Sequence, residues 1–209
     1  MHIALFVHHP HCSVDSANGI IKALSPQHTF KLFTKDQVED TFFNDVDIIA
    51  IPGGIGDSDS FDRLMSNNFD SVKKYINSGG RYLGICMGAY WADQDYFNIL
   101  DNARATQYIT RPNTDTKRPH AKAMPIVWKD TAYKMYFYDG CAISGEGEFE
   151  TIATYPNGDA MAVIQKRIGL IGCHPESSEY WYNKNYLKPH WHNGLHYDLL
   201  RDFVDQLGR

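Results

Sequence analysis

The 209-residue sequence contains no long apolar run. No stretch approaches the roughly 20 consecutive apolar residues that a membrane-spanning helix needs. The apolar run near the start, residues 3–7, has no basic segment before it and is too short for a secretory signal, and neither terminus shows a lipidation pattern. The sequence therefore predicts a cytoplasmic protein that does not associate with membranes.

Concentrated positive charge is also missing. The 20 Lys and Arg residues are outnumbered by 25 Asp and Glu residues, which gives a formal net charge of -5, and the basic residues are scattered along the chain. Proteins that bind nucleic acid usually gather Lys and Arg on one face or in one segment. We therefore expect no nucleic-acid partner.

Cysteines are few and lie far apart, at Cys12, Cys86, Cys141 and Cys173. No two of them form a C-x-x-C pair, so neither a zinc knuckle nor a dithiol redox motif is indicated. Without an export signal we expect four free thiols. The question is then which thiol is chemically active.

The composition, 43% hydrophobic and 22% charged, is that of a globular protein, and the length favours one domain over residues 1–209. In the first half, short apolar runs alternate with helix-compatible segments at residues 16–24, with Ser16 as the expected N-cap, and 69–76, which ends at a glycine pair. This alternation predicts an α/β fold with a mostly parallel sheet. The expected strands cover residues 3–7, 30–33, 47–51 and 81–86.

The second half of the sequence differs in the type and spacing of its expected elements. Residues 100–125 show mixed charge, three prolines and no sustained period, which predicts a long surface excursion. Closely spaced strands follow, with Asn157-Gly158-Asp159 as a hairpin turn, and a final amphipathic helix is expected over residues 195–207. The second half therefore adds antiparallel strands, expected over residues 133–138, 149–155, 160–166 and 168–173.

Gly84-Ile85-Cys86-Met87-Gly88 lies between an expected strand and a helix-compatible run. A sharp strand-to-helix turn strains the central residue and leaves little room two positions to either side, so glycine is favoured at both flanks. Such a turn lifts the sulfur above the sheet edge, where unpaired backbone N–H groups favour the thiolate. The alternative is a buried structural cysteine in a glycine-containing turn.

A second motif, Gly172-Cys173-His174-Pro175-Glu176, ends another expected strand about 90 residues later. If that strand ends at the same edge of the sheet, His174 reaches the thiol and Glu176 orients the imidazole. A histidine alone is more often a packed or solvated residue than a base. The two motifs together predict a triad of Cys86, His174 and Glu176.

Ile51-Pro52-Gly53-Gly54 ends a third strand and exposes backbone N–H groups where open α/β sheets bind their ligands. Beside a nucleophile, Gly53, Gly54 and the Met87 amide form an expected oxyanion and substrate-binding site, with the Gly54 and Met87 amides as the donor pair. In isolation the segment is a simple turn.

These motifs resemble the three signatures of class I glutamine amidotransferases, whose fold is a flavodoxin-like three-layer α/β/α sandwich. Over roughly residues 1–180 the sequence also resembles the amidotransferase-like N-terminal domain of eukaryotic biotin–protein ligases. This wider similarity rests on residues 78–90, 136–141, 153–158 and the His-Pro-Glu turn. The adenylate-binding loop of the ligases is absent, so biotin ligation by this chain alone is not expected.

The resemblance implies a cysteine-dependent enzyme that acts on a carboxamide or related acyl group of a small molecule, without a cofactor. Ala89-Tyr90 follow the elbow where glutamine-hydrolysing members usually carry a polar pair, and no synthetase domain is present, so the substrate need not be glutamine and any transfer needs a partner protein. The alternative is a non-catalytic binding or regulatory module that works through a partner.

Other polar and aromatic groups have simpler interpretations. His8, His9 and His11, and likewise the group His190, His192 and His196, have too irregular a setting to predict a metal site, and none is expected. The aromatic residues between 180 and 191 are expected to pack the C-terminal segment onto the body, with a wall of the site as the alternative. Glu146 and Glu148 are assigned to a solvated loop.

Overall fold

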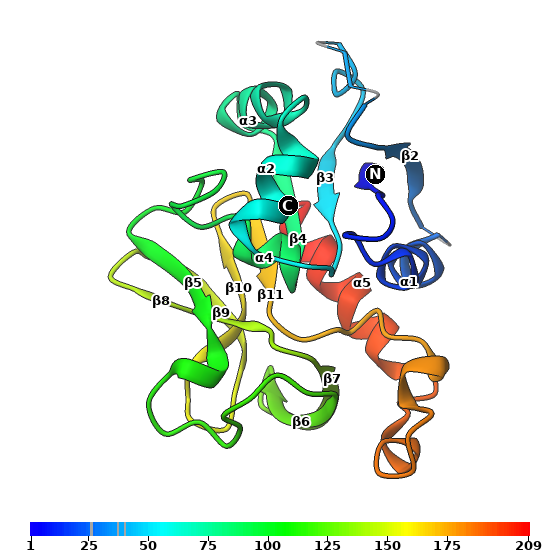
Figure 1. The fold of residues 1–209 in the computed structure, drawn as a ribbon, viewed down its shortest axis with the longest axis vertical. Helices are drawn as coiled ribbons and strands as arrows, with labels where there is room; N and C mark the ends of the chain where they lie inside the picture. Colours follow the sequence, from blue (N-terminus) through cyan, green and yellow to red (C-terminus); the bar gives the residue numbers. More distant parts are fainter. Residues whose placement is uncertain (26, 37, 40) are drawn as a thin grey trace.

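The computed structural model describes residues 1–25, 27–36, 38–39 and 41–209. Its centre is an eleven-stranded sheet (Figure 1). The N-terminal strands and the last strand pair in parallel, in the order β2-β1-β3-β4-β11. Their bounds are β1 (His2–Phe6), β2 (Thr29–Phe33), β3 (Ile48–Ile51), β4 (Arg81–Ile85) and β11 (Ile168–Ile171).

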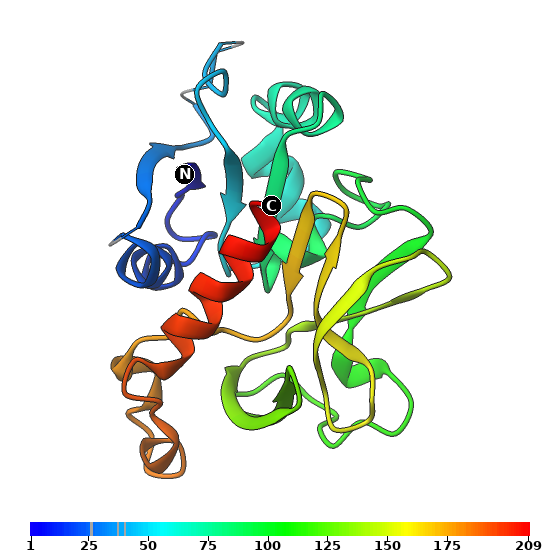
Figure 2. The same cartoon turned by 180° about the vertical axis from the view of Figure 1, so that it is seen from behind.

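Helices cover both faces of this parallel region, because its strands are apolar on both sides. Leu5 packs in the same core as Ile20 of α1 (Val14–Leu24) and the apolar residues of α5 (Leu195–Leu207), which crosses the sheet in Figure 2. Phe6 faces the opposite layer, formed by α2 (Ser58–Met65), α3 (Phe69–Asn77) and α4 (Met87–Tyr90). The three-layer flavodoxin-like architecture is confirmed. No described helix has the length and apolar character that crossing a membrane requires.

The second half extends the sheet with antiparallel strands, as predicted. β10 (Ala160–Gln165) pairs with β11 and with β9 (Glu150–Thr154), and the β9–β10 turn places Gly158 at φ +89°. On its other side β9 pairs with β6 (Lys122–Trp128), which forms a hairpin with β7 (Thr131–Phe137). A side branch joins β10 to β8 (Cys141–Gly145) and β8 to β5 (Ala103–Gln107).

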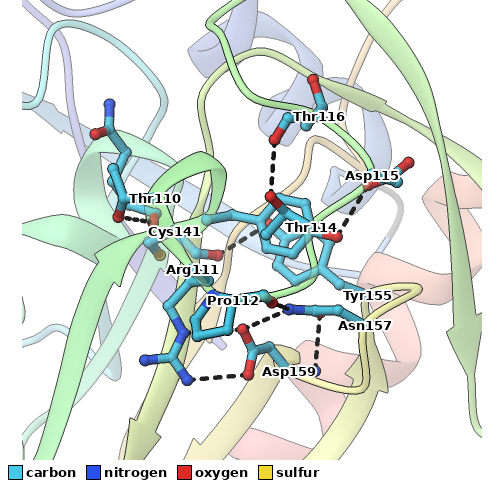
Figure 3. A network of polar contacts seen from close by, with 12 residues as sticks. Thr110, Arg111, Pro112, Thr114, Asp115, Thr116, Cys141, Tyr155, Asn157 and Asp159 are labelled. Carbon is cyan, nitrogen blue, oxygen red and sulfur yellow. Dashed lines mark hydrogen bonds and ion pairs between the residues drawn. The ribbon is translucent and has the colours of Figure 1, made fainter.

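The prediction of a long excursion over residues 100–125 was wrong in part, because this segment contains β5, a 3₁₀ turn at Tyr108–Thr110 and the start of β6. Polar contacts hold the remainder against the β9–β10 hairpin (Figure 3). Arg111 donates to both carboxylate oxygens of Asp159 at 2.9 and 3.0 Å, and Asn157 Nδ2 donates to Pro112 O at 3.0 Å. Partners about 45 residues away in sequence thus order a segment that has no local period.

The start of α1 also differs from the prediction. Ser13 is the N-cap, and its side chain accepts a hydrogen bond from the Ser16 amide at 3.1 Å. Ser16 lies inside the helix, fully buried, on the same face as Ile20. Its hydroxyl is therefore free for a partner outside the helix.

Candidate active site

Cys86 occupies a sharp turn between β4 and α4, at φ 50° and ψ -101°. Residues other than glycine rarely adopt a positive φ, and strain of this kind concentrates at functional sites. The flanking glycines are sterically required. A Cβ on Gly84 would lie 2.4 Å from Gly88 O, and a Cβ on Gly88 would lie 2.1 Å from Ile51 O. The turn has the shape of a nucleophile elbow.

His174 follows β11 and lies beside the thiol. Its backbone N–H donates to Tyr136 O at 2.9 Å, which fixes this turn against β7. The residue is 4% exposed, its Nδ1 lies 2.8 Å from Glu176 Oε1, and it lines the same cavity as Cys86. Because Nδ1 is bonded to Glu176, Nε2 is the atom left for the sulfur. The structure thus brings together the three side chains that the two motifs single out.

Ser16 is a further member of this network that the sequence did not reveal. Its hydroxyl donates to Glu176 Oε1 at 2.6 Å and accepts from the Gly53 N–H at 2.9 Å. One turn along α1, a Cβ on Gly19 would lie 2.2 Å from Glu176 O, so the helix approaches the turn closely only with glycine there. The only local signal was a serine on the apolar face of a helix.

The loop after β3 and the start of α4 hold the three residues expected to form the oxyanion and substrate-binding site. The Gly53 N–H is bound to Ser16, so Gly53 is not a donor; instead it makes room for the imidazole, because a Cβ there would lie 2.7 Å from His174 Cε1. In the part of the chain that is described, neither Gly54 nor Met87 donates its N–H to a backbone or side-chain acceptor. Both amides are available to a ligand.

Buried charges set the protonation of the imidazole. Burial by itself lowers the pKa of His174, but the neighbouring Glu176 and Cys86, with the hydrogen bond to Glu176, outweigh it and raise the pKa to about 10. The histidine is therefore an imidazolium near neutral pH. Glu176 is fully buried, and its Oε2 has no hydrogen-bond partner within the described residues, so this adjacent cation is its main compensation.

A cavity of about 500 Å³ opens above Cys86 and His174. Trp181, on the 3₁₀ turn Glu179–Tyr182, stands edge-on to the His174 ring at a centroid distance of 5.0 Å, and Tyr136 stands edge-on at 5.9 Å. Trp181 and Tyr180 thus wall the site, against the expectation that they only pack the C-terminal segment. Tyr182 and Trp191 pack in a small apolar cluster, as expected, whereas Tyr186 is exposed and donates its hydroxyl to Ala121 O at 3.1 Å.

His192 has a structural role at the start of α5. Among the described residues, no group of three His, Cys, Asp or Glu side chains is placed to hold a metal ion. His192 Nδ1 accepts from the N–H groups of Gly194 at 3.1 Å and His196 at 3.3 Å, and its Nε2 donates to Ser177 O at 3.0 Å. It therefore caps the N-terminus of α5 in its neutral form.

We expect His196 to make the protein less stable in acid. Burial lowers the pKa of His196 to about 3, and the chain binds this proton only when unfolded, where the pKa is about 6.5. The contribution of the neutral His196 to the free energy of unfolding is therefore fully present above pH 6.5. Because of this group, the free energy of unfolding falls by up to about 1.4 kcal/mol per pH unit as the pH drops toward 3. Urea unfolding of His196→Gln at pH 7 and pH 5 measures this effect, and the variant should lose less stability between the two values than the parent does. Equal losses would contradict the assignment.

Residues 10–105 match the family described as Biotin-protein ligase, N terminal. A glutamine amidotransferase aligns over 99% of both chains at 16% identity with a TM-score of 0.67, and a glutamine amidotransferase from Thermotoga maritima aligns over 100% of this chain and 98% of its own at 11% identity with a TM-score of 0.69. The chain has the class I glutamine amidotransferase-like fold.

The same fold recurs in PurLQS from Thermotoga maritima, which aligns over 99% of this chain and 98% of its own at 11% identity with a TM-score of 0.66. At these identities the amidotransferase-like fold is shared without a close sequence relationship. Comparison with curated proteins gives no match. The match to the ligase family covers residues 10–105, which contain the elbow, whereas the motifs placed the resemblance over roughly residues 1–180.

Proposed function

We propose that this protein is a cysteine-dependent hydrolase of the amidotransferase type, acting on a carboxamide or related acyl group of a small molecule. The proposal is supported by the placement of Cys86, on a strained elbow, in the same cavity as His174, whose buried imidazole is hydrogen-bonded to Glu176. An amidotransferase-like fold is consistent with this chemistry.

The geometry supports a two-step reaction. Cys86 Sγ attacks the carbonyl carbon, and the oxyanion accepts hydrogen bonds from the Gly54 and Met87 amides. His174 gives its proton to the leaving nitrogen, so that the C–N bond breaks and a thioester remains. A water molecule then gives a proton to His174 while its oxygen attacks the thioester. The C–S bond breaks, the acid leaves, and the sulfur and the protonated imidazole are restored. Glu176 holds the ring through Nδ1, and Ser16 holds Glu176. No cofactor enters these steps.

The reactivity of the thiol tests the proposal. An imidazolium beside Cys86 stabilises negative charge on the sulfur, so we expect iodoacetamide to label Cys86 rapidly at pH 6 and the rate to fall by about tenfold or more in His174→Ala. Peptide mass spectrometry compares Cys86 with Cys141, which burial keeps protonated by raising its pKa. Labelling of Cys86 no faster than that of Cys141 would overturn the proposal.

A second candidate is a binding or regulatory module that acts through a partner protein. The residue after Ala89 favours this candidate. Glutamine-hydrolysing relatives usually carry a polar pair after the elbow, whereas here the half-buried Tyr90 donates its hydroxyl to Asp139 O at 3.1 Å. Under this candidate a Cys86→Ser variant captures the same partner and keeps its biological activity. Loss of that activity in Cys86→Ser favours the enzyme.

A further inference from the structure

A second cavity, also of about 500 Å³, lies on the other side of Cys86. Cys86, Gly54 and Tyr138 line both cavities, so the thiol and one oxyanion donor stand at their boundary. A substrate whose carbonyl carbon meets the sulfur there extends one substituent into each cavity. The residues of the second cavity away from this boundary are Ile55, Gly56, Asp57, Tyr90, Tyr96, Gln107 and Asp139.

The position of His174, the proposed general acid, indicates which substituent of the substrate occupies which cavity. His174 lines the first cavity but not the second. Because the leaving group must receive its proton from His174, it occupies the first cavity, between the aromatic walls. The acyl group, which stays on the sulfur, therefore occupies the second cavity.

The second cavity is acidic. Its charged lining residues are Asp57 and Asp139, and no Lys, Arg or His lines it. Asp57 caps α2 by accepting from the Ser60 N–H at 2.8 Å. A carboxylate on the acyl group would meet like charge there, whereas an ammonium would meet opposite charge.

Asp139 is the residue of this cavity whose carboxylate would be stabilised by a cationic group on a ligand. It is half-buried, and Gln107 Nε2 donates to its two oxygens at 2.9 and 2.8 Å. Burial raises the pKa of its carboxyl group, and no ion pair within the described ranges involves it. The hydroxyls of Tyr90 and Tyr96 donate to the backbone carbonyls of Asp139 and Gly56, both at 3.1 Å, so neither proton satisfies the carboxylate.

We propose that the second cavity takes a cationic acyl group, with Asp139 as the residue that selects it. The inference rests on the proposed function, because the acyl assignment uses His174 as the general acid. Free glutamine carries a carboxylate beside its ammonium on the acyl side, so we expect an acyl group that is cationic and lacks that carboxylate to be preferred over it.

Charged thiol reagents test the charge of this cavity without requiring turnover. The rates at which cationic 2-aminoethyl and anionic 2-sulfonatoethyl methanethiosulfonate modify Cys86 are measured by mass spectrometry and divided by their rates with N-acetylcysteine. The cation should be favoured by about fivefold or more, and Asp139→Asn should remove most of this preference. Asp15→Asn, the same charge change in the first cavity, should change it less. No preference for the cation, or equal effects of the two variants, would overturn the proposal.

Activated esters test the substrate class. The p-nitrophenyl esters of 4-(trimethylammonio)butanoic acid, 5,5-dimethylhexanoic acid and glutaric acid carry cationic, neutral and anionic acyl groups. We expect kcat/KM to be highest for the cationic ester, about tenfold above the anionic one, and Asp139→Asn to level the series. Preference for the glutaryl ester would overturn the cationic assignment and leave the hydrolase standing. Hydrolysis of none of the three would count against the hydrolase and, with it, against the acyl assignment.

Discussion

Replacing Cys86 with alanine is expected to reduce kcat by about 10⁴-fold or more for any amide or activated ester that the protein hydrolyses. In the proposed reaction the Cys86 sulfur, which lies at the boundary of the two cavities, forms the bond to the acyl carbon. His174→Ala should cost nearly as much, because the imidazole both supports the attack and protonates the leaving group. Ammonia release from glutamine and a panel of amides, together with ester hydrolysis, provides the measurement.

The double variant makes this prediction sharper. Residues that act as one unit have strongly non-additive effects, so Cys86→Ala combined with His174→Ala should be no slower than the slower single variant. Cys141→Ala, which alters a buried cysteine outside the proposed machinery, controls for effects of core substitution and should keep most of the activity. If the two single losses multiply instead, Cys86 and His174 do not share a mechanism.

Ser16→Ala is expected to lower both activity and stability. The substitution leaves the Gly53 N–H without its acceptor and removes a donor from the buried Glu176, which should cost about 1–3 kcal/mol in the free energy of unfolding. The looser carboxylate holds the imidazole less well, so kcat should fall about tenfold while KM changes little. Urea unfolding and steady-state kinetics measure the two effects.

A matched control separates positioning from stability. Asn68→Ala removes a different buried hydrogen bond, from Nδ2 to Thr34 O at 3.0 Å, at the start of α3 in the other helix layer. It should cost a similar amount of stability and leave kcat unchanged. Ser16→Ala should also slow the alkylation of Cys86, and Asn68→Ala should not. If the two variants show equal kinetics, Ser16 has only a structural role.

The sequence anticipated those parts of the fold whose signals are local. The apolar runs of β1, β3, β4 and β11 stand out because both faces of the parallel sheet are covered, and the one-sided apolar spacing of residues 195–207 matches α5. The elbow was visible because its glycines are required by contacts within a few residues of Cys86 or with the neighbouring strand.

Features that depend on distant partners were missed. β5 alternates small Ala residues with Arg104 and Thr106, a weak strand signal, and becomes a strand by pairing with β8 about 40 residues away. Arg104 is held there by a two-pronged contact with Asp93, at 2.9 and 2.8 Å. Ser16 meets Glu176 across 160 positions of sequence. No local pattern encodes such contacts, because they arise only when the layers assemble.

Trapping the covalent intermediate tests the central claim most directly. The protein is mixed with an ester or amide that it hydrolyses, quenched in acid within the first turnover, digested and analysed by peptide mass spectrometry. If Cys86 is the nucleophile, the peptide that contains Cys86 should be heavier by the mass of the acyl group. The Cys86→Ala variant should show no such adduct. Turnover that depends on the intact site but leaves the acyl group on another residue, or on none, would contradict this role of Cys86.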